Sequence, residues 1–210
     1  MLYAVPVSLL MGYLMGSLNP AALLDKVKHA NMRKRGTHNL GTTNTLYVLG
    51  KKWAALVLIF DMLKAFFAVQ LSWWFFPLHP VAGLISGTSA VLGHIYPFYM
   101  GFKGGKGLAA FGGLVLAVDP MIFLILLGIA LVLMLLLNYS VCTPVSAGIL
   151  FPILYGLKHQ DLMGALVVAV AGLVLVIKNI AGFGRVRRGE EMGFRSAILK
   201  IFSGKFHAEE

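Results

Sequence analysis

Long runs of apolar residues, separated by short polar stretches, dominate this chain and restrict what it can fold into. Hydrophobic residues make up 59% of the 210 positions and charged residues only 12%, about half the charge that a soluble domain usually carries. A run of about 20 apolar residues forms a helix that is long enough to cross the ~30 Å hydrocarbon core of a bilayer. The sequence therefore predicts an integral membrane protein built from helices.

Seven apolar segments can be distinguished along the chain. They cover residues 3–24, 53–76, 80–100, 107–118, 121–137, 144–157 and 162–183. At least two are too short to cross upright at a rise of about 1.5 Å per residue, and short segments beside glycine-rich loops are typical of broken or tilted helices that line a polar cavity. We expect an all-α fold of about seven transmembrane helices, some short or broken, in a single polytopic domain over residues 1–210.

The positions of the basic residues predict how the helices are oriented. Fifteen of the eighteen Lys and Arg lie in residues 25–52, in the loop with Lys103 and Lys106, or in the tail from about residue 184. The positive-inside rule places such stretches in the cytoplasm, so an odd number of spans puts the N-terminus outside and the C-terminus inside. This distribution explains the net charge of +10 without nucleic acid, and the basic tail can also contact anionic lipid headgroups.

Residues 93–107 combine charge with backbone freedom at the end of an apolar run. Lys103 and Lys106 lie there among glycines that include Gly104 and Gly105. Glycines let the backbone approach a ligand and turn its N–H groups toward it, and lysines supply point charges for an anion. The pattern favours a phosphate site at the membrane surface, with an ordinary cytoplasmic turn as the alternative.

A second polar stretch, residues 33–44, begins with a basic cluster and contains Thr37, Asn39, Gly41 and Asn44. Thr and Asn side chains form hydrogen bonds with hydroxyl and phosphate oxygens. A polar loop that caps the next helix is the alternative. Since two such loops are predicted on one face of the membrane, we expect them to share a site.

Asp61 and Lys64 lie inside a predicted span, three residues apart and on roughly the same helix face. Ionisable groups in a span usually face the bundle interior or a wet cavity. A structural pair or a supporting role beside the site is favoured over a proton relay, and His94 can be either structural or functional. The single cysteine, Cys142, excludes an internal disulfide framework and a multi-cysteine metal site, and we expect no metal or other cofactor.

Taken together, these stretches resemble the bacterial acyl-phosphate:glycerol-3-phosphate acyltransferases, nearly from end to end. The similar positions are Gly16-Ser17 with Pro20, residues 33–44, Asp61-xx-Lys64, residues 93–107, and Asn179-Ile180 before Gly189-Glu190. The resemblance implies a multi-pass enzyme of the bacterial plasma membrane that acts in phospholipid biosynthesis. It also implies seven spans with an external N-terminus, in agreement with the charge pattern.

The reaction implied by the resemblance moves a fatty acyl group from acyl-phosphate to the 1-hydroxyl of glycerol 3-phosphate, which gives lysophosphatidic acid. An acyl-phosphate is already activated, so positioning and charge stabilisation can supply most of the catalysis. The implied catalytic residues are Lys106 and Asn39. The implied substrate-binding residues are Thr37, Gly41, Asn44, Lys103, Gly104, Gly105 and Asn179, with His94, Asp61 and Lys64 supporting the site.

The chain departs from the family pattern at several positions. Thr37-His38 stands where the family usually has Ser-Gly, Ala65 replaces a glycine, Tyr47 replaces an arginine and Val176 replaces a histidine. A serine motif after the fifth segment is only partly present in residues 138–140. Tyrosine and valine cannot replace the lost charge, so a weakened or re-targeted relative that binds phosphate or lipid is the main alternative.

Two further classes of protein are less favoured. A transporter or channel would account for Asp61 and Lys64 in a span. An ATP-binding P-loop does not fit, because only three residues separate Gly101 from Gly105, and Gly107 stands where Ser or Thr should hold magnesium.

Overall fold

The computed structural model describes residues 3–189, 193–196 and 199, and this part of the chain is helical and contains no strand. The elements are α1 (Ala4–Ser17), α2 (Pro20–Lys28), α3 (Thr42–Leu49), α4 (Lys51–Phe75), α5 (Pro80–Ile95), the 3-10 turn η1 (Phe98–Met100), α6 (Leu108–Val118), α7 (Pro120–Leu137), α8 (Cys142–His159) and α9 (Leu162–Arg187). The prediction of an all-α membrane fold is confirmed.

Five helical stretches of the described chain are long and apolar enough to cross a membrane. They are Ala4–Lys28, Lys51–Phe75, Pro80–Met100, Pro120–Leu137 and Leu162–Arg187. The two remaining apolar segments of the sequence form α6 and α8. With 11 residues at about 1.5 Å each, α6 is only ~16 Å long and covers about half of a bilayer core. The expectation of short segments is therefore confirmed for α6, whereas α8 has 18 residues and is longer than its apolar segment predicts.

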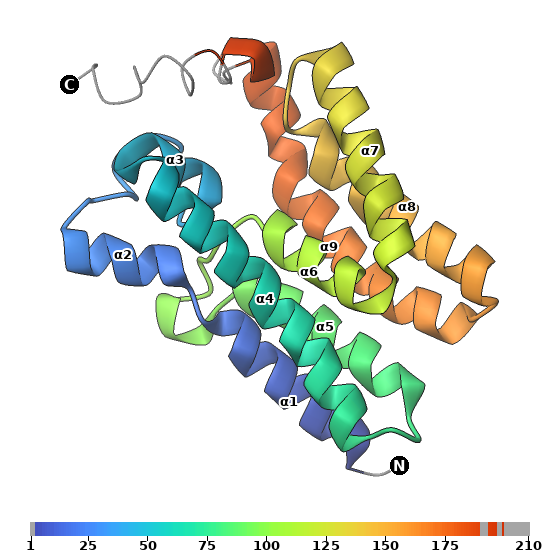
Figure 1. Cartoon of the computed structure of the whole chain (residues 1–210). Helices are drawn as coiled ribbons and strands as arrows, with labels where there is room; N and C mark the ends of the chain where they lie inside the picture. Colours follow the sequence, from blue (N-terminus) through green and yellow to red (C-terminus); the bar gives the residue numbers. More distant parts are fainter. Residues whose placement is uncertain (1–2, 190–192, 197–198, 200–210) are drawn as a thin grey trace.

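The first predicted segment, residues 3–24, is not one continuous helix. α1 ends at Ser17, and α2 begins at Pro20 in a different direction (Figure 1). Proline lacks an N–H donor and restricts the residue before it to extended backbone, and Asn19 is extended here. The Asn19 side chain accepts a hydrogen bond from the Ala22 N–H at 2.9 Å and so caps the new helix.

Close contact between helices depends on small residues. A Cβ added at Gly12 or Gly16 of α1 would overlap the backbone of Ser86 or Ala90 on α5. The Gly12-xxx-Gly16 spacing therefore permits close packing of α1 on α5. α6 packs on α4 and continues into α7, so α6 lies between these two helices. Apolar residues of α4 to α9 form the main buried core.

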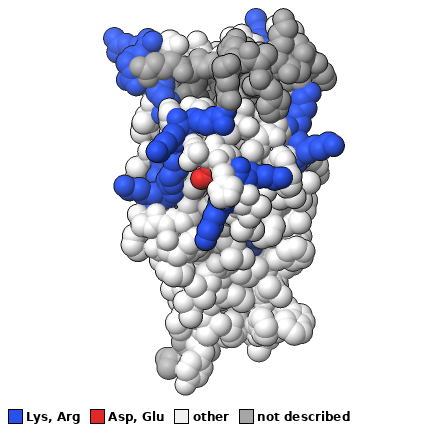
Figure 2. All heavy atoms as spheres, turned by 90° about the vertical axis from the view of Figure 1, so that its left-hand side faces the viewer, with Lys and Arg blue, Asp and Glu red and all other residues white. Residues whose placement is uncertain are grey.

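On one face of the molecule, the basic residues lie toward one end (Figure 2). Figure 2 shows Lys and Arg over the half of this face that carries α2 and α3, whereas the opposite half is uncharged. A charged end next to an apolar band is the arrangement expected of a protein seated in a bilayer. The assignment of the charged end to the cytoplasm stays a prediction.

Asp119 joins three helices at the turn between α6 and α7. Its Oδ1 accepts hydrogen bonds from the Met121 and Ile122 N–H groups at 3.0 Å, and its Oδ2 lies 2.6 Å from Lys158 Nζ and 2.9 Å from His159 Nε2. Burial raises the pKa of this carboxyl, but the hydrogen bonds from Lys158, Ile122 and His159 outweigh burial and lower the pKa to about 2. The predicted separation of the apolar segments 107–118 and 121–137 is confirmed, since α6 ends at Val118 and α7 begins at Pro120.

We expect Asp119→Ala to lower the free energy of unfolding by about 1–2 kcal/mol, because both the helix cap and the ion pair are lost. Asp119→Asn keeps the cap acceptor and should cost less. The folded pKa lies below the ordinary value of 3.8, so the carboxylate stabilises the fold above about pH 4 and loses this effect as the pH falls toward 2. Thermal unfolding of the three proteins in detergent tests both points; equal losses in the Ala and Asn variants would contradict the capping role.

Candidate functional site

A cavity of about 430 Å³ lies between the loop before α3 and helices α4, α6, α7, α8 and α9. Part of its wall is polar. The polar lining residues include Thr37, Asn39, Thr42, Thr43, Lys106, Asn179 and Arg185. The rest of the wall is apolar and is formed mainly by α4, α6 and α7. The cavity can therefore hold an anionic group at one end and a hydrocarbon chain at the other.

The structure brings most of the predicted site residues to this cavity, although they come from distant parts of the sequence. Those that line it are Thr37, Asn39, Gly41, Asp61, His94, Lys106 and Asn179. Those that do not are Asn44, Lys64, Lys103, Gly104 and Gly105. The expectation that two polar loops share one site therefore agrees with the geometry.

The lysine-bearing loop folds back onto the end of α5. The Gly104 N–H donates to the Ile95 carbonyl at 3.0 Å, and the Gly105 N–H donates to the His94 carbonyl at 3.1 Å. From α9, Asn179 Nδ2 donates to the Lys106 carbonyl at 3.0 Å. These bonds fix the backbone on both sides of the Lys106 side chain.

The bonding of this loop differs from the prediction that Gly104 and Gly105 N–H groups hold a phosphate. Both donors are used by carbonyls of α5. Glycine is needed for another reason: a Cβ at Gly104 would overlap the His94 carbonyl oxygen, and one at Gly105 would overlap the His94 ring. The exposed Lys103 contributes through its backbone, because its carbonyl accepts a hydrogen bond from Arg33 Nη2 at 2.7 Å.

Asn44 shapes the other loop instead of lining the cavity. Its Oδ1 accepts from the Thr37 N–H at 2.6 Å, and its Nδ2 donates to the Met32 carbonyl at 2.7 Å. The side chain is almost fully buried, so both ends of the amide are occupied by the protein. Asn44 thus holds Thr37 in place and is not positioned to contact a substrate.

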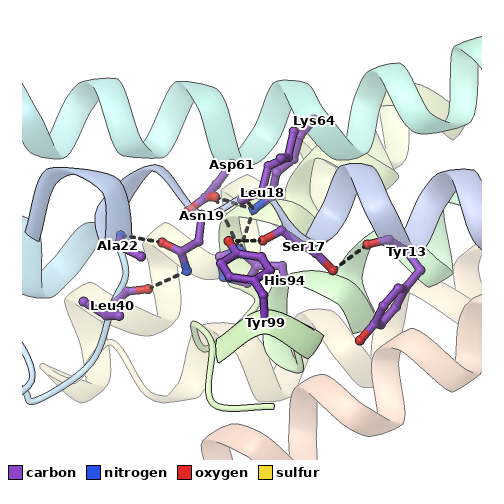
Figure 3. Close-up of polar contacts among 10 residues, drawn as sticks. All are labelled: Tyr13, Ser17, Leu18, Asn19, Ala22, Leu40, Asp61, Lys64, His94 and Tyr99. Carbon is purple, nitrogen blue, oxygen red and sulfur yellow. Dashed lines mark hydrogen bonds and ion pairs between the residues drawn. The ribbon is translucent and has the colours of Figure 1, made fainter. Parts of the chain in front are cut away.

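Asp61, Lys64 and His94 form a buried polar cluster next to the lysine-bearing loop (Figure 3). Lys64 Nζ lies 2.6 Å from the Leu18 carbonyl, 2.7 Å from Asp61 Oδ1 and 2.9 Å from His94 Nδ1. An ammonium group has three donors and no acceptor, so these three contacts use all of them. His94 Nδ1 also lies 3.3 Å from Asp61 Oδ1, so the ring contacts both members of the pair, and its Nε2 lies on the side of Gly105.

This cluster connects α1, α4 and α5, and His94 carries the contact onward to the loop at Gly105. The preference for a structural or supporting role of Asp61 and Lys64 fits this geometry. Asp61 and His94 also line the cavity.

Sequence reasoning missed five polar residues of the cavity, namely Thr42, Thr43, Ser140, Thr143 and Arg185. The Thr42 and Thr143 hydroxyls are buried and have no hydrogen-bond partner within the described residues, and Arg185 adds a positive charge from α9. Nothing in the sequence distinguishes Thr42 from the neighbouring threonines. Arg185 belongs to the basic tail, whose charge the positive-inside rule already explains, so the sequence gives no separate reason to place it at the site. Glu190, of the predicted C-terminal motif, lies outside the described residues.

Comparison with known proteins identifies the family. The glycerol-3-phosphate acyltransferase profile matches residues 6–189. The chain belongs to this family. It is 34% identical to the glycerol-3-phosphate acyltransferase of Streptococcus thermophilus (strain CNRZ 1066) over 193 residues, with 87% of this chain and 90% of the relative covered. It is also 34% identical to that of Staphylococcus aureus (strain bovine RF122 / ET3-1) over 194 residues, with 88% and 95% covered.

Solved structures of the glycerol-3-phosphate acyltransferase family share this fold. The crystal structure of PlsY, an integral membrane glycerol 3-phosphate acyltransferase, in its glycerol 3-phosphate form matches with a TM-score of 0.83 and 29% identity, over 90% of this chain and 95% of that one. The lysophosphatidic acid form of the same enzyme matches with a TM-score of 0.81 and 28% identity, over 90% and 94%. The protein is therefore a multi-pass membrane member of an acyltransferase family.

The structure shows the surroundings of three residues that depart from the family pattern, Val176, Ala65 and His38. Val176 packs at the α8–α9 contact, where its Cγ2 would lie 3.0 Å from a Cβ added at Gly148. Ala65 is fully buried in the core. His38 adopts φ +56°, in the left-handed region that favours glycine, and its Nδ1 lies 3.2 Å from the Arg33 carbonyl. The loop therefore keeps a glycine-like backbone at His38.

We expect Lys64→Met to be strongly destabilising, by about 3–5 kcal/mol, because Asp61 would keep a buried charge without its partner. The double variant Asp61→Asn/Lys64→Met removes both charges and should recover part of the loss. Thermal unfolding of the single and double variants in detergent measures this coupling. A double variant that is no more stable than Lys64→Met would show that the charge pair is not what matters.

We expect His38→Gly to be at least as stable as the wild type, since glycine adopts φ near +56° without steric cost. His38→Val should be less stable by about 1–2 kcal/mol, because a β-branched residue is strongly disfavoured there. The same unfolding measurement compares the two, and equal stability of the Val and Gly variants would contradict the assigned backbone conformation.

Proposed function

We propose that this protein transfers a fatty acyl group from an acyl-phosphate to the 1-hydroxyl of glycerol 3-phosphate and releases lysophosphatidic acid. One observation carries the proposal: a single cavity joins a basic, polar end to an apolar wall between membrane helices. Such a cavity suits a donor that has a charged head and a hydrocarbon tail. The two solved relatives, in glycerol 3-phosphate and lysophosphatidic acid forms, support the same acceptor and product.

The chemistry requires little from the protein beyond positioning and charge. The acceptor oxygen forms a bond to the acyl carbon, the bond from that carbon to the phosphate oxygen breaks, and inorganic phosphate leaves with the hydroxyl proton. We assign Lys106 to the negative charge of the phosphate groups, and Arg185 adds a second positive charge to the cavity wall. The leaving phosphate is itself basic enough to accept the proton, so no side chain has to act as general base.

The polar loop residues orient the acceptor in this proposal. Thr37 and Asn39 line the cavity opposite the lysine-bearing loop and offer hydroxyl and amide groups to glycerol 3-phosphate. Gly41 brings the backbone close to the cavity, and Asn179 closes the site by fixing the Lys106 backbone. Holding two reactants in a reactive geometry can account for a large part of the rate.

The apolar wall supports entry of the donor from the bilayer. Leu58 on α4 and Leu127 on α7 both line the cavity and are 40% and 44% exposed on the molecular surface. We place the basic, polar end on the cytoplasmic side, where soluble glycerol 3-phosphate is available and where the positive-inside rule puts the basic loops.

A re-targeted or weakened relative is the second candidate. Tyr47 and Val176 favour it, because they remove a cation and an imidazole that the family usually has. Val176 packs between α8 and α9, so nothing at that position replaces the imidazole. In this case the cavity would bind phosphate or lipid without acyl transfer to glycerol 3-phosphate.

The deciding experiment supplies purified protein with palmitoyl-phosphate and labelled glycerol 3-phosphate. We expect labelled lysophosphatidic acid from the wild type and a fall of about 10²-fold or more for Lys106→Ala, because a group that stabilises developing charge is lost. Lys26→Ala is the matched control, since Lys26 is exposed on α2 and outside the cavity. Near-normal turnover by Lys106→Ala would refute the role of Lys106, and folded wild type without product would favour the second candidate.

A further inference from the structure

The apolar end of the cavity contains a glycine that helix packing does not require. Gly112 and Gly113 are neighbours on α6, and their surroundings differ. A Cβ at Gly113 would overlap the backbone of Met62 on α4, so this glycine is needed for the helices to meet. A Cβ at Gly112 would lie 3.6 Å from Phe123 Cε2 and 4.0 Å from Met62 Cε, which are ordinary contacts.

Glycine inside a helix is costly, because alanine stabilises a helix interior by roughly 0.5–1 kcal/mol more than glycine does. Gly112 has neither a steric reason nor an unusual φ that would require it. It does line the cavity, together with Met62 and Phe123. A small residue at this position preserves space inside the cavity, because any side chain longer than a methyl group would extend between those two side chains.

We propose that Gly112 determines the length of acyl chain that the site accepts, by keeping a passage open between Met62 and Phe123 for the distal methylenes. This inference rests on the proposed function, because it takes the occupant to be the chain of an acyl-phosphate. It adds a specificity-determining residue that makes no contact with the reacting groups.

The position of Gly112 along α6 sets which chains are affected. Gly112 lies five residues beyond Gly107, or about 7.5 Å along the helix from the level of the lysine-bearing loop. With C–C bonds of about 1.5 Å, an extended chain covers that distance within roughly six carbons. A short acyl group therefore ends near Gly112, whereas a palmitoyl group has to pass it.

The test is the ratio of kcat/KM for palmitoyl-phosphate to that for octanoyl-phosphate. Gly112→Leu should lower this ratio at least tenfold, because one methylene that loses its place in an apolar pocket changes discrimination by about tenfold or more. Gly128→Leu is the matched control: Gly128 lies on α7 outside the cavity, and a Cβ there would meet nothing within 4 Å. This control should keep the wild-type ratio.

A second variant changes the cavity in the opposite direction. Phe123→Ala enlarges the same end and should raise the ratio, so the inference stays testable if Gly112→Leu does not fold. An unchanged ratio in an active Gly112→Leu, or an equal loss for both donors, would overturn it.

A binding measurement separates this inference from the proposed reaction. Palmitoyl-phosphate should raise the unfolding temperature of the wild type and of Gly128→Leu, but much less that of Gly112→Leu. If the wild type shows this stabilisation without turnover, the proposed reaction fails and the chain site stands. If palmitoyl-phosphate stabilises all three proteins equally, the chain site fails.

Discussion

The ammonium group of Lys64 is the contact on which the arrangement of this site depends. A lysine charge within a membrane bundle is costly unless polar groups surround it, and here the ammonium contacts polar atoms on three segments: the end of α1, α4 itself and α5. Through His94 the same contact reaches the loop that carries Lys106. A short series of contacts through His94 thus connects the buried Lys64 to the loop that carries Lys106, which lines the cavity.

Much of the fold could be predicted from hydropathy alone, because the apolar segments of the sequence are helical and the segments 107–118 and 121–137 form separate helices. The split at Asn19-Pro20 was missed, because the apolar residues continue across it and hydropathy does not register a missing N–H donor. The residues that indicate this break are Asn19, which can cap a helix, and Pro20, which can begin one.

The sequence predicts which residues gather at the site better than it predicts the role of each residue. Polar residues in a membrane chain are few, so their gathering at one cavity follows from the cost of leaving them in lipid. Which groups face the ligand depends on long-range bonds that the sequence does not show. Gly104 and Asn44 illustrate this. The Gly104 N–H donates to the Ile95 carbonyl, and Asn44 Nδ2 donates to the Met32 carbonyl, so neither group faces the ligand. Arg185 illustrates the converse, since only the fold brings it to the cavity.

The short length of α6 has a consequence for the lipid leaflets. α6 forms part of the cavity wall and, at ~16 Å, is long enough to cross only about half of a bilayer core, so a passage along it that opens at one membrane surface would end near the mid-plane. A donor that enters between α4 and α7 and a product that leaves the same way would remain in one monolayer throughout. An enzyme of this shape adds new lipid to a single leaflet, and equalising the two sides of the membrane is left to other proteins.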